Sequence, residues 1–492
     1  MLSPAPNASQ LPLFHVVGFS GHRQLADPAG VAQAITTLLG ELQSEAPGEW
    51  IALSSAAAGA DLIFVKAALG LGLGWEAVLP LPLVDFERDF PPHEWPEVRQ
   101  LLNRAEHLEV AAEPGSREEA YLSGGYEIVH NCDLLLAVWD GQPARGKGGT
   151  ADIVAYARAM GLPVAIIDPD TKTVIRENFA SLRFQDANLR YLNAMPGQPA
   201  INDTSRERVA AFQQKVDEAA TRSSPQFRQL IALTVSLLVI AAALAAGSLA
   251  FGWHGTALLW SKLLCLCTAL GVAMYVRYQR TQHHWTRCRL AAEITRSTLA
   301  IWGLPRATRL FSDFNWSGLE PLRRSLDVLH RRAAREAPRK FDAVKRQYLA
   351  NRIEDQLAYF ARQEARSNPL LSRLRAAFIA SSVAAIFCTA GYALPAAVGG
   401  QLPPMLAAVF FNFAPILLPM LAAAFISLIS INDLHRRAAR YREMAIRLEA
   451  LHKEIVHSKT WAGLERAIAK AERVLLQEVF EWHSITSFTE SR

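Results

Sequence analysis

Two stretches of the chain carry no charged side chain over a length that can cross a membrane. The first lies between Arg228 and Lys262, and the second lies between Arg375 and Asp433. Because a membrane-spanning helix needs about 20 apolar residues, each stretch predicts two spans joined by a short turn. The four predicted spans are residues 230–251, 256–276, 376–394 and 405–431.

Short apolar runs alternate with amphipathic stretches over the first third of the chain. The apolar runs are residues 14–19, 50–54, 77–81, 107–111, 133–139 and 164–167. Helical patterns fill the gaps at residues 31–42, 60–69, 94–105, 118–130 and 151–160. Strands that alternate with helices indicate a parallel sheet with helices on both faces. The predicted fold is therefore an α/β Rossmann-like parallel-sheet N-terminal domain, followed by an all-α membrane domain with four transmembrane helices and long cytoplasmic helices.

The surroundings of the two hairpins are alike and suggest an internal repeat. A serine-containing segment with a proline, predicted to be a break, precedes each hairpin at residues 222–225 and 366–369. An arginine-rich amphipathic run follows each at residues 278–303 and 435–457, and should continue as a cytoplasmic helix. The predicted domains are 12–170 (α/β domain), 171–225 (connector), 226–303 (first hairpin and cytoplasmic helix), 304–370 (helical linker) and 371–492 (second hairpin and cytoplasmic helices).

Charge is distributed unevenly between these parts. The 492 residues carry a net charge of +5, but residues 1–170 contain 9 Lys and Arg against 22 Asp and Glu, a net of −13. An acidic domain repels a phosphate backbone, so nucleic acid is not an expected partner. The arginines of the remainder flank the outer ends of both hairpins and are absent from the tips, which predicts that both termini are cytoplasmic.

Metal, disulfide and ion-coupled transport chemistry find little support in the sequence. The five cysteines, at positions 132, 265, 267, 288 and 388, show no paired or metal-ligand spacing. The predicted spans contain no acidic residue or histidine relay near the middle of the membrane, which disfavours a proton pump or an ion-coupled transporter. No metal site is expected.

Three loops rich in small residues follow predicted strands, at residues 18–23, 54–61 and 140–152. The carboxyl ends of parallel strands meet at one edge of a sheet, where α/β domains bind their ligands. Small residues admit a ligand close to the backbone, a helix N-terminus attracts an anion, and Arg23 can bind a phosphate or a carboxylate. The loops therefore predict a nucleotide-type pocket. Its candidate residues are Gly18, Ser20, Gly21, His22, Arg23, Ser54, Gly59, Asp61, Asp140, Lys147, Gly148, Gly149 and Thr150.

Several of these residues also have a structural interpretation. A glycine between a strand and a helix often serves only to make the turn. His22 would act either as an acid or base or as a hydrogen-bond donor. Asp61 would bind a ribose or would only complement the helix dipole, and Lys147 would contact the ligand or only solvate its loop.

The motifs of the N-terminal domain together resemble the SLOG superfamily, which includes the LOG phosphoribohydrolases and the sensor domains of TRPM channels. They are G-x-S-G-H-R at 18–23, S-x-x-A-x-G-A-D at 54–61, an apolar strand at 78–82 followed by Asp89-Phe90, W-D-G at 139–141 and G-K-G-G-T-A-D at 146–152. The resemblance implies that a nucleotide-derived signal binds here. By position, residues 18, 20, 21 and 23 would face the ligand, 59 and 61 would hold its sugar or phosphate, and 148–150 would hold a phosphate.

The duplicated hairpins with basic tails resemble SLATT domains, which are two-helix membrane effectors of bacterial conflict systems. This resemblance implies a nucleotide-sensing integral membrane effector, ligand-gated and pore-forming or membrane-perturbing, in a bacterial antiviral defence system. The expected location is the bacterial inner membrane. The expected partners are a nucleotide-like small molecule, the lipid bilayer and further copies of the chain in a homo-oligomer.

An enzymatic alternative remains open. LOG enzymes carry a P-G-G-x-G-T-x-x-E signature whose glutamate serves catalysis. Here the residue three after Thr150 is Ile153, and the nearest acid is Asp152. The alternative function is a membrane-tethered nucleotide N-glycoside hydrolase with Asp61, Asp152 or Glu127 as acid or base, and a scaffold with a degenerate pocket is a third possibility.

Overall fold

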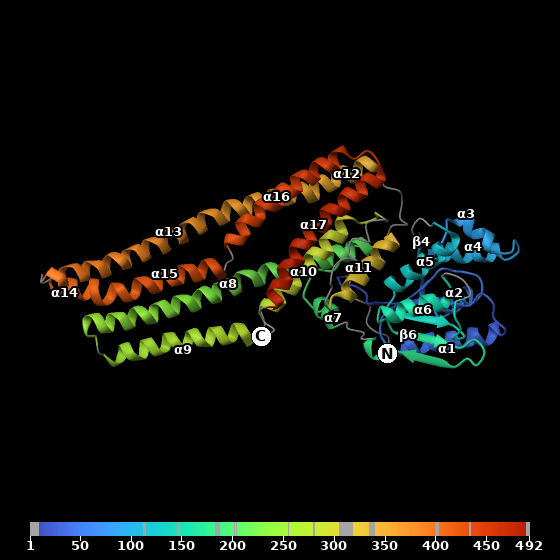
Figure 1. Cartoon of the computed structure of the whole chain (residues 1–492), viewed down its shortest axis with the longest axis horizontal. Coiled ribbons are helices and arrows are strands. Elements are labelled where there is room, and N and C mark those ends of the chain that lie inside the picture. The colour runs from blue at the N-terminus through green and yellow to red at the C-terminus, as the bar shows by residue number, and fades with distance from the viewer. Residues whose placement is uncertain are drawn as a thin grey trace. The chain divides into compact units, whose positions relative to one another are not determined.

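The protein folds into two compact units, one built on a sheet and one entirely helical (Figure 1). The first unit comprises Met1–Phe212 and Ile301–Ala337, and the second comprises Gln213–Ala300 and Pro338–Arg492. The structure is a computed structural model and describes residues 9–111, 115–144, 148–182, 187–200, 202, 204–253, 255–278, 281–304, 318–333, 340–398, 403–431 and 434–488.

A seven-stranded sheet forms the centre of the first unit, with the strand order β4-β3-β2-β1-β5-β6-β7. All neighbouring strands are parallel except β6 and β7. The order reverses at β1, which pairs with β2 on one side and with β5 on the other. The strands are β1 (Phe14–Gly21), β2 (Glu49–Ser54), β3 (Gly74–Leu79), β4 (His107–Val110), β5 (Leu134–Val138), β6 (Val164–Ile167) and β7 (Val174–Glu177).

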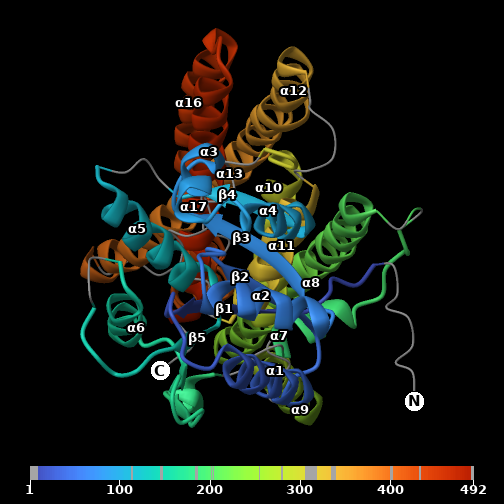
Figure 2. The same ribbon diagram turned by 90° about the vertical axis from the view of Figure 1, so that its right-hand side faces the viewer.

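Helices cover both faces of this sheet, and in Figure 2 α5 and α6 lie on the opposite side from α2 and α4. The predicted α/β architecture is confirmed. The helices of this unit are α1 (Pro28–Glu45), α2 (Ala60–Gly70), α3 (Leu83–Phe86), α4 (Trp95–Arg104), α5 (Arg117–Asn131), α6 (Thr150–Ala159), α7 (Ala187–Asn193) and α11 (Glu320–Ala333), with short 3-10 turns at η1 (Glu87–Asp89) and η2 (Phe179–Ser181).

Local sequence explains how these elements begin and what they bury. Helix α1 begins where the Asp27 side chain accepts a hydrogen bond from the Gly30 amide, with Pro28 at the first helical position. Its buried residues recur at helical spacing, so that one face packs on the sheet. They are Val31, Ile35, Leu38, Leu39 and Leu42.

Helix α11 belongs to the first unit and contacts β1, and it lies within residues 304–370, which were predicted to form a helical linker between the hairpins. It places three arginines against acidic residues near the amino ends of the sheet strands. The ion pairs are Arg331–Glu76 (2.9 Å), Arg332–Glu106 (2.7 Å), Arg332–Glu49 (3.1 Å) and Arg324–Asp133. The sheet unit therefore has two segments that are separated by the first hairpin.

The second unit contains four helices that are long and apolar enough to cross a membrane, as predicted. They are Gln229–Phe251, Thr256–Val276, Phe341–Gly391 and Pro404–Ser430. Two long hairpins are visible, one formed by α8 and α9 and one by α13 and α15 (Figure 1). The elements are α8 (Ser205–Phe251), α9 (Thr256–Tyr278), α10 (Thr281–Ala300), α12 (Phe341–Tyr348), the π-helix η4 (Leu349–Glu354), α13 (Asp355–Val398), α14 (Pro404–Ala407), the π-helix η5 (Ala408–Phe413), α15 (Ala414–Ile431), α16 (Leu434–His457) and α17 (Trp461–Phe488).

The prolines expected to break the chain before each hairpin do not do so. Helix α8 continues through Pro225 and α13 continues through Pro369. A proline inside a helix removes one backbone hydrogen bond, but these helices have 47 and 44 residues, and the remaining bonds and packing maintain them. The first helix of each hairpin therefore extends from outside the membrane into its span without interruption.

Candidate functional site

A cavity of about 740 Å³ lies at the carboxyl edge of the sheet, where β1 and β5 end side by side. This is the point at which the strand order reverses, the usual ligand position in open α/β sheets. Nine of the residues predicted from sequence line the cavity: Ser20, Gly21, His22, Arg23, Asp61, Asp140, Gly148, Gly149 and Thr150. The predicted loops therefore converge on one site.

Gly18 serves packing behind the cavity rather than contact with its interior. A Cβ at this position would meet Cys132 Sγ at 2.7 Å and the Ile128 side chain at 2.8 Å. It belongs to the middle of β1, whereas Ser20 and Gly21 are the last two residues of the strand. Gly18 is thus required for the close approach of α5 to β1.

His22 and Asp140 connect the end of β1 with the loop after β5. The Asp140 amide donates to His22 Nε2 at 3.2 Å, and Asp140 Oδ1 lies 3.1 Å from the same nitrogen. The Gln142 amide, together with His22, holds the pKa of Asp140 below its ordinary value against the opposing effect of burial. Both side chains line the cavity, so they can present a carboxylate and an imidazole to a ligand.

Asp61 is buried at the start of α2, with only 3% of its surface exposed. The hydroxyls of Ser54 and Ser55 each donate to its Oδ1 at 3.0 Å. Burial raises the pKa of Asp61 to about 6, although the two serines, the Gly21 amide and the charge of Arg23 oppose the shift. The carboxylate therefore holds the end of β2 in place. Ser54 does not line the cavity, and it contributes to the site only by its hydrogen bond to Asp61.

Gly59 precedes α2 and allows the first two loops to meet. Its φ of +91° is a left-handed conformation, and a Cβ there would lie 2.3 Å from the Arg23 carbonyl oxygen. The Ala60 amide donates to the His22 carbonyl at 3.0 Å next to this contact. Gly59 does not line the cavity, but its close approach fixes the backbone that carries His22 and Arg23.

Helix α6 directs its N-terminus toward the cavity, through Gly149 as the N-cap and Thr150 as the first residue. Gly148 has a φ of +81°, and a Cβ there would lie 2.7 Å from the Leu122 nitrogen. Asp152, the acid nearest to the position of the catalytic glutamate in the LOG signature, accepts a hydrogen bond from the Gly148 amide through Oδ2 at 3.0 Å. Its carboxylate therefore stabilises the loop that precedes α6. The predicted contact of Lys147 lies outside the described residues.

Two residues of the cavity wall, Arg117 and Tyr121, were missed in the sequence. They lie four residues apart on α5, and Asp89 holds both: it accepts from Arg117 Nε at 3.1 Å and from the Tyr121 hydroxyl. The Arg23 guanidinium lies over the Tyr121 ring, 4.7 Å from its centroid. The Asp89-Phe90 motif and the spacing on α5 were the available signals, but only the fold brings them together.

Glu127, the third candidate acid, does not line the cavity and accepts a hydrogen bond from Asn131 Nδ2 at 3.2 Å. Of the three acids considered for an enzyme, Asp61 alone borders the cavity. Within the described part of the chain, no group of three or more His, Cys, Asp and Glu residues is arranged to hold a metal ion.

Comparison with protein families concerns the hairpins. Residues 348–482 match the SMODS and SLOG-associating 2TM effector domain 1, and residues 211–302 match the SMODS and SLOG-associating 2TM effector domain 3. The chain contains two SLATT domains. The first SLATT domain includes α9 and α10, and the second includes η4, α13, α15, α16 and most of α17. The expected duplication thus consists of two different SLATT types.

Neither family match includes the sheet. No curated protein and no solved structure matches the chain. The SLATT matches and the four apolar helices indicate a multi-pass membrane protein with two effector hairpins. The SLOG resemblance of the sheet unit stays a prediction from its motifs.

Proposed function

We propose that the protein is a membrane effector whose two SLATT domains are controlled by a nucleotide-like ligand that binds in the cavity of the sheet unit. One observation carries this proposal: the Arg23 loop and the N-terminus of α6 border the same cavity at the strand-order reversal. Free amides at a helix N-terminus and a guanidinium are suited to a phosphate.

The remaining polar groups suit recognition of the rest of a nucleotide. Asp140 and His22 offer hydrogen-bond partners for a sugar or a base, and Tyr121 and Trp139 offer aromatic surface. Binding changes the state of the membrane part only if the ligand has different affinities for two arrangements of the protein. The proposed location is a bacterial inner membrane, with both termini cytoplasmic. Several copies of the chain would assemble there to form a pore or to perturb the bilayer, as an effector of a bacterial defence system.

A second candidate, hydrolysis of a nucleotide N-glycosidic bond, is favoured by Asp61 alone. A carboxyl group with a pKa near 6 at a cavity wall can exchange protons near neutral pH. Its Oδ1, however, already accepts hydrogen bonds from Ser54 and Ser55, and Asp152 is bonded to its own loop. Release of free base from nucleoside monophosphates by the purified protein would support this candidate over the effector.

The effector proposal is tested by efflux from liposomes that contain the full-length protein, with mono-, di- and cyclic nucleotides added. One nucleotide should trigger efflux, and Arg23→Ala should weaken the binding of that nucleotide in titration calorimetry by at least tenfold. Arg104→Ala is the matched control, because Arg104 lies on the same unit outside the cavity lining. A normal response of the Arg23→Ala variant would refute the assignment of the site.

A further inference from the structure

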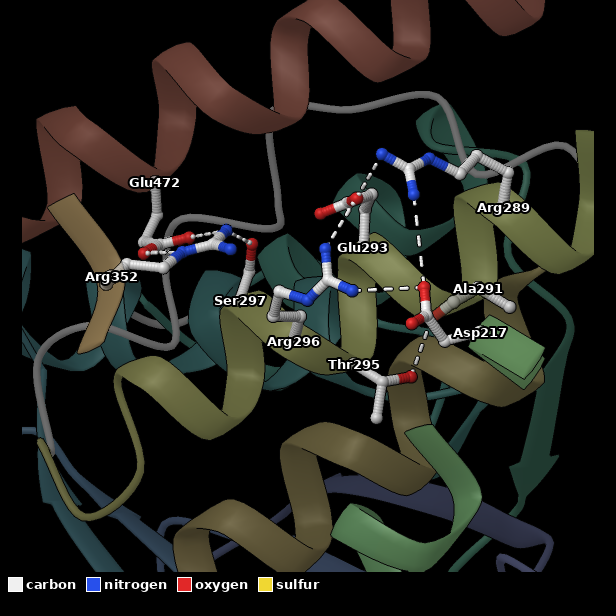
Figure 3. A network of polar contacts seen from close by, with 9 residues as sticks. All are labelled: Asp217, Arg289, Ala291, Glu293, Thr295, Arg296, Ser297, Arg352 and Glu472. Atoms are coloured by element: carbon white, nitrogen blue, oxygen red, sulfur yellow. Dashed lines mark hydrogen bonds and ion pairs between the residues drawn. The ribbon is translucent and has the colours of Figure 1, made fainter. Parts of the chain in front are cut away.

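A buried polar junction connects the two SLATT domains outside their spans (Figure 3). Arg352 on η4 donates to Glu472 of α17 through Nε at 2.9 Å and through Nη2 at 2.8 Å. The two side chains are 4% and 0% exposed. A buried ion pair adds little net stability compared with apolar packing, but removing one of its partners is costly because the other charge is then left unpaired.

Arg352 also contacts the first SLATT domain. Its Nη2 donates to Ser297 Oγ of α10 at 3.1 Å. Its Nη1 is buried and makes no hydrogen bond in the described structure, and an unpaired buried donor costs free energy. In this arrangement Nη2 is shared between the Glu472 carboxylate and a neutral hydroxyl of α10, and Nη1 is unsatisfied.

A carboxylate lies one helical turn before that hydroxyl. Glu293 and Ser297 are four residues apart, so they occupy the same face of α10. Glu293 is buried and pairs with Arg289 at 2.7 Å and with Arg296 at 2.8 Å. Burial alone would raise its pKa, but Arg289, Arg296 and Arg352 bring the pKa below its ordinary value, so Glu293 is charged.

Movement of helix α10 along its own axis would require Leu290 and Ile294 to repack, because both are buried. Its other buried residues include small ones such as Ala291 and Ala292, which hinder such a movement least. The buried hydroxyls of Thr295 and Thr298 donate to carbonyl groups of their own helix, at 2.6 and 3.0 Å, so these bonds would move with it.

The polar partners on α8 tolerate the same movement. Asp217 Oδ1 lies 3.0 Å from an Arg296 nitrogen and 3.9 Å from an Arg289 nitrogen. These arginines are two turns apart, so Asp217 would still have Arg289 beside it if α10 advanced by one turn. Both arginines would move together with Glu293, because all three belong to one helix.

We propose that α10 occupies two registers one turn apart against Arg352, with Ser297 opposite the arginine in this structure and Glu293 opposite it in the other. One turn is about 5.4 Å along the helix axis. In the second register Glu293 supplies the acceptor that Nη1 lacks. Because α10 begins three residues after α9 ends, the shift moves the first hairpin along the second. The inference concerns the effector domains and holds for any trigger.

Substitutions at Ser297 and Glu293 test the two registers without a ligand. Ser297→Ala removes the acceptor of the present register and should raise the population of the second about fivefold, as expected for one hydrogen bond. Ser297→Glu supplies a carboxylate in the present register and should empty the second. Glu293→Gln should also empty it and should cancel the effect of Ser297→Ala.

The readout is the distance between spin labels at Arg287→Cys on α10 and Gln477→Cys on α17, which are both exposed positions. The measurement uses the full-length protein in lipid nanodiscs, with its native cysteines replaced. Two distances that differ by up to about 5 Å should exchange population in the stated directions. A label pair at Arg466→Cys and Gln477→Cys within α17 should not change. A single distance in all variants, or shifts in the same direction for Ser297→Ala and Glu293→Gln, would overturn the proposal, because a merely structural role of Arg352 predicts no opposing shifts.

Discussion

Replacing Arg331 by alanine should loosen α11 from the sheet far more than replacing its neighbour Arg332. Arg331 pairs with Glu76, and the two side chains are 13% and 3% exposed. Removing one partner of a buried pair leaves an uncompensated charge and costs about 3–5 kcal/mol. The partners of Arg332, Glu106 and Glu49, are 33% and 52% exposed, so water can solvate them, and the expected cost is at most about 1 kcal/mol.

Hydrogen exchange of the α11 amides in the full-length protein measures this difference directly. A loss of 3–5 kcal/mol raises the opening equilibrium of the helix by two to three orders of magnitude, since about 1.4 kcal/mol corresponds to a factor of ten. The Arg332→Ala variant is the matched control on the same helix. Equal exchange of residues 320–333 in both variants would refute the reasoning, because it would mean that Glu76 is solvated after Arg331 is removed. The double variant Arg331→Met, Glu76→Leu should recover much of the protection, because neither charge of this pair is then left buried without its partner.

Two further predictions concern the cavity. Gly59→Ala should abolish ligand binding and destabilise the sheet unit by at least about 1 kcal/mol, because the new Cβ would lie 2.3 Å from the Arg23 carbonyl oxygen. Gly72→Ala is the control, because Gly72 also has a positive φ but a Cβ there would meet no atom within 4 Å. Thermal unfolding of the Gly72→Ala variant should show a smaller loss of stability, and its ligand binding should be intact. The pKa of Asp61 is raised to about 6 in the folded state, so the folded state binds the proton more tightly. The contribution of Asp61 to stability should therefore be fully present below the unfolded pKa of about 4 and should be lost, by up to about 3 kcal/mol, as the pH rises from about 4 to 6. Asp61→Asn should remove this part of the pH dependence in thermal unfolding; an identical pH profile in the variant would contradict the assigned pKa.

The fold class could be predicted from the sequence because its signals are local. Uncharged runs of membrane length identify spans without any tertiary information, and alternating strand and helix patterns indicate a parallel sheet. Helix α11 could not be placed in the same way. A basic amphipathic helix has the same pattern whether its arginines face water, lipid headgroups or acidic strand ends, and only the fold decides between them.

The positions of the candidate residues could be predicted where strand ends defined them, but not where helix packing decided them. The loops after β1 and β5 do converge, so Arg23, Asp140 and Thr150 share one cavity. Gly18, three residues before Gly21, instead packs against α5, and residue spacing cannot distinguish contact with a ligand from contact with a helix. Arg117 and Tyr121 were missed because their approach to the Arg23 loop depends on the packing of α5.

The division of the sheet unit into two segments constrains how the chain crosses the bilayer. The segment before the first hairpin and the segment after it, which contains α11, fold into one unit that is held by ion pairs such as Arg331–Glu76. A single folded unit occupies one side of a membrane. The intervening chain must therefore cross the bilayer an even number of times, whichever leaflet its arginines face. An insertion error that left only one of these two spans in the bilayer would separate α11 from its sheet, so assembly of the sheet unit itself requires that the first hairpin is complete.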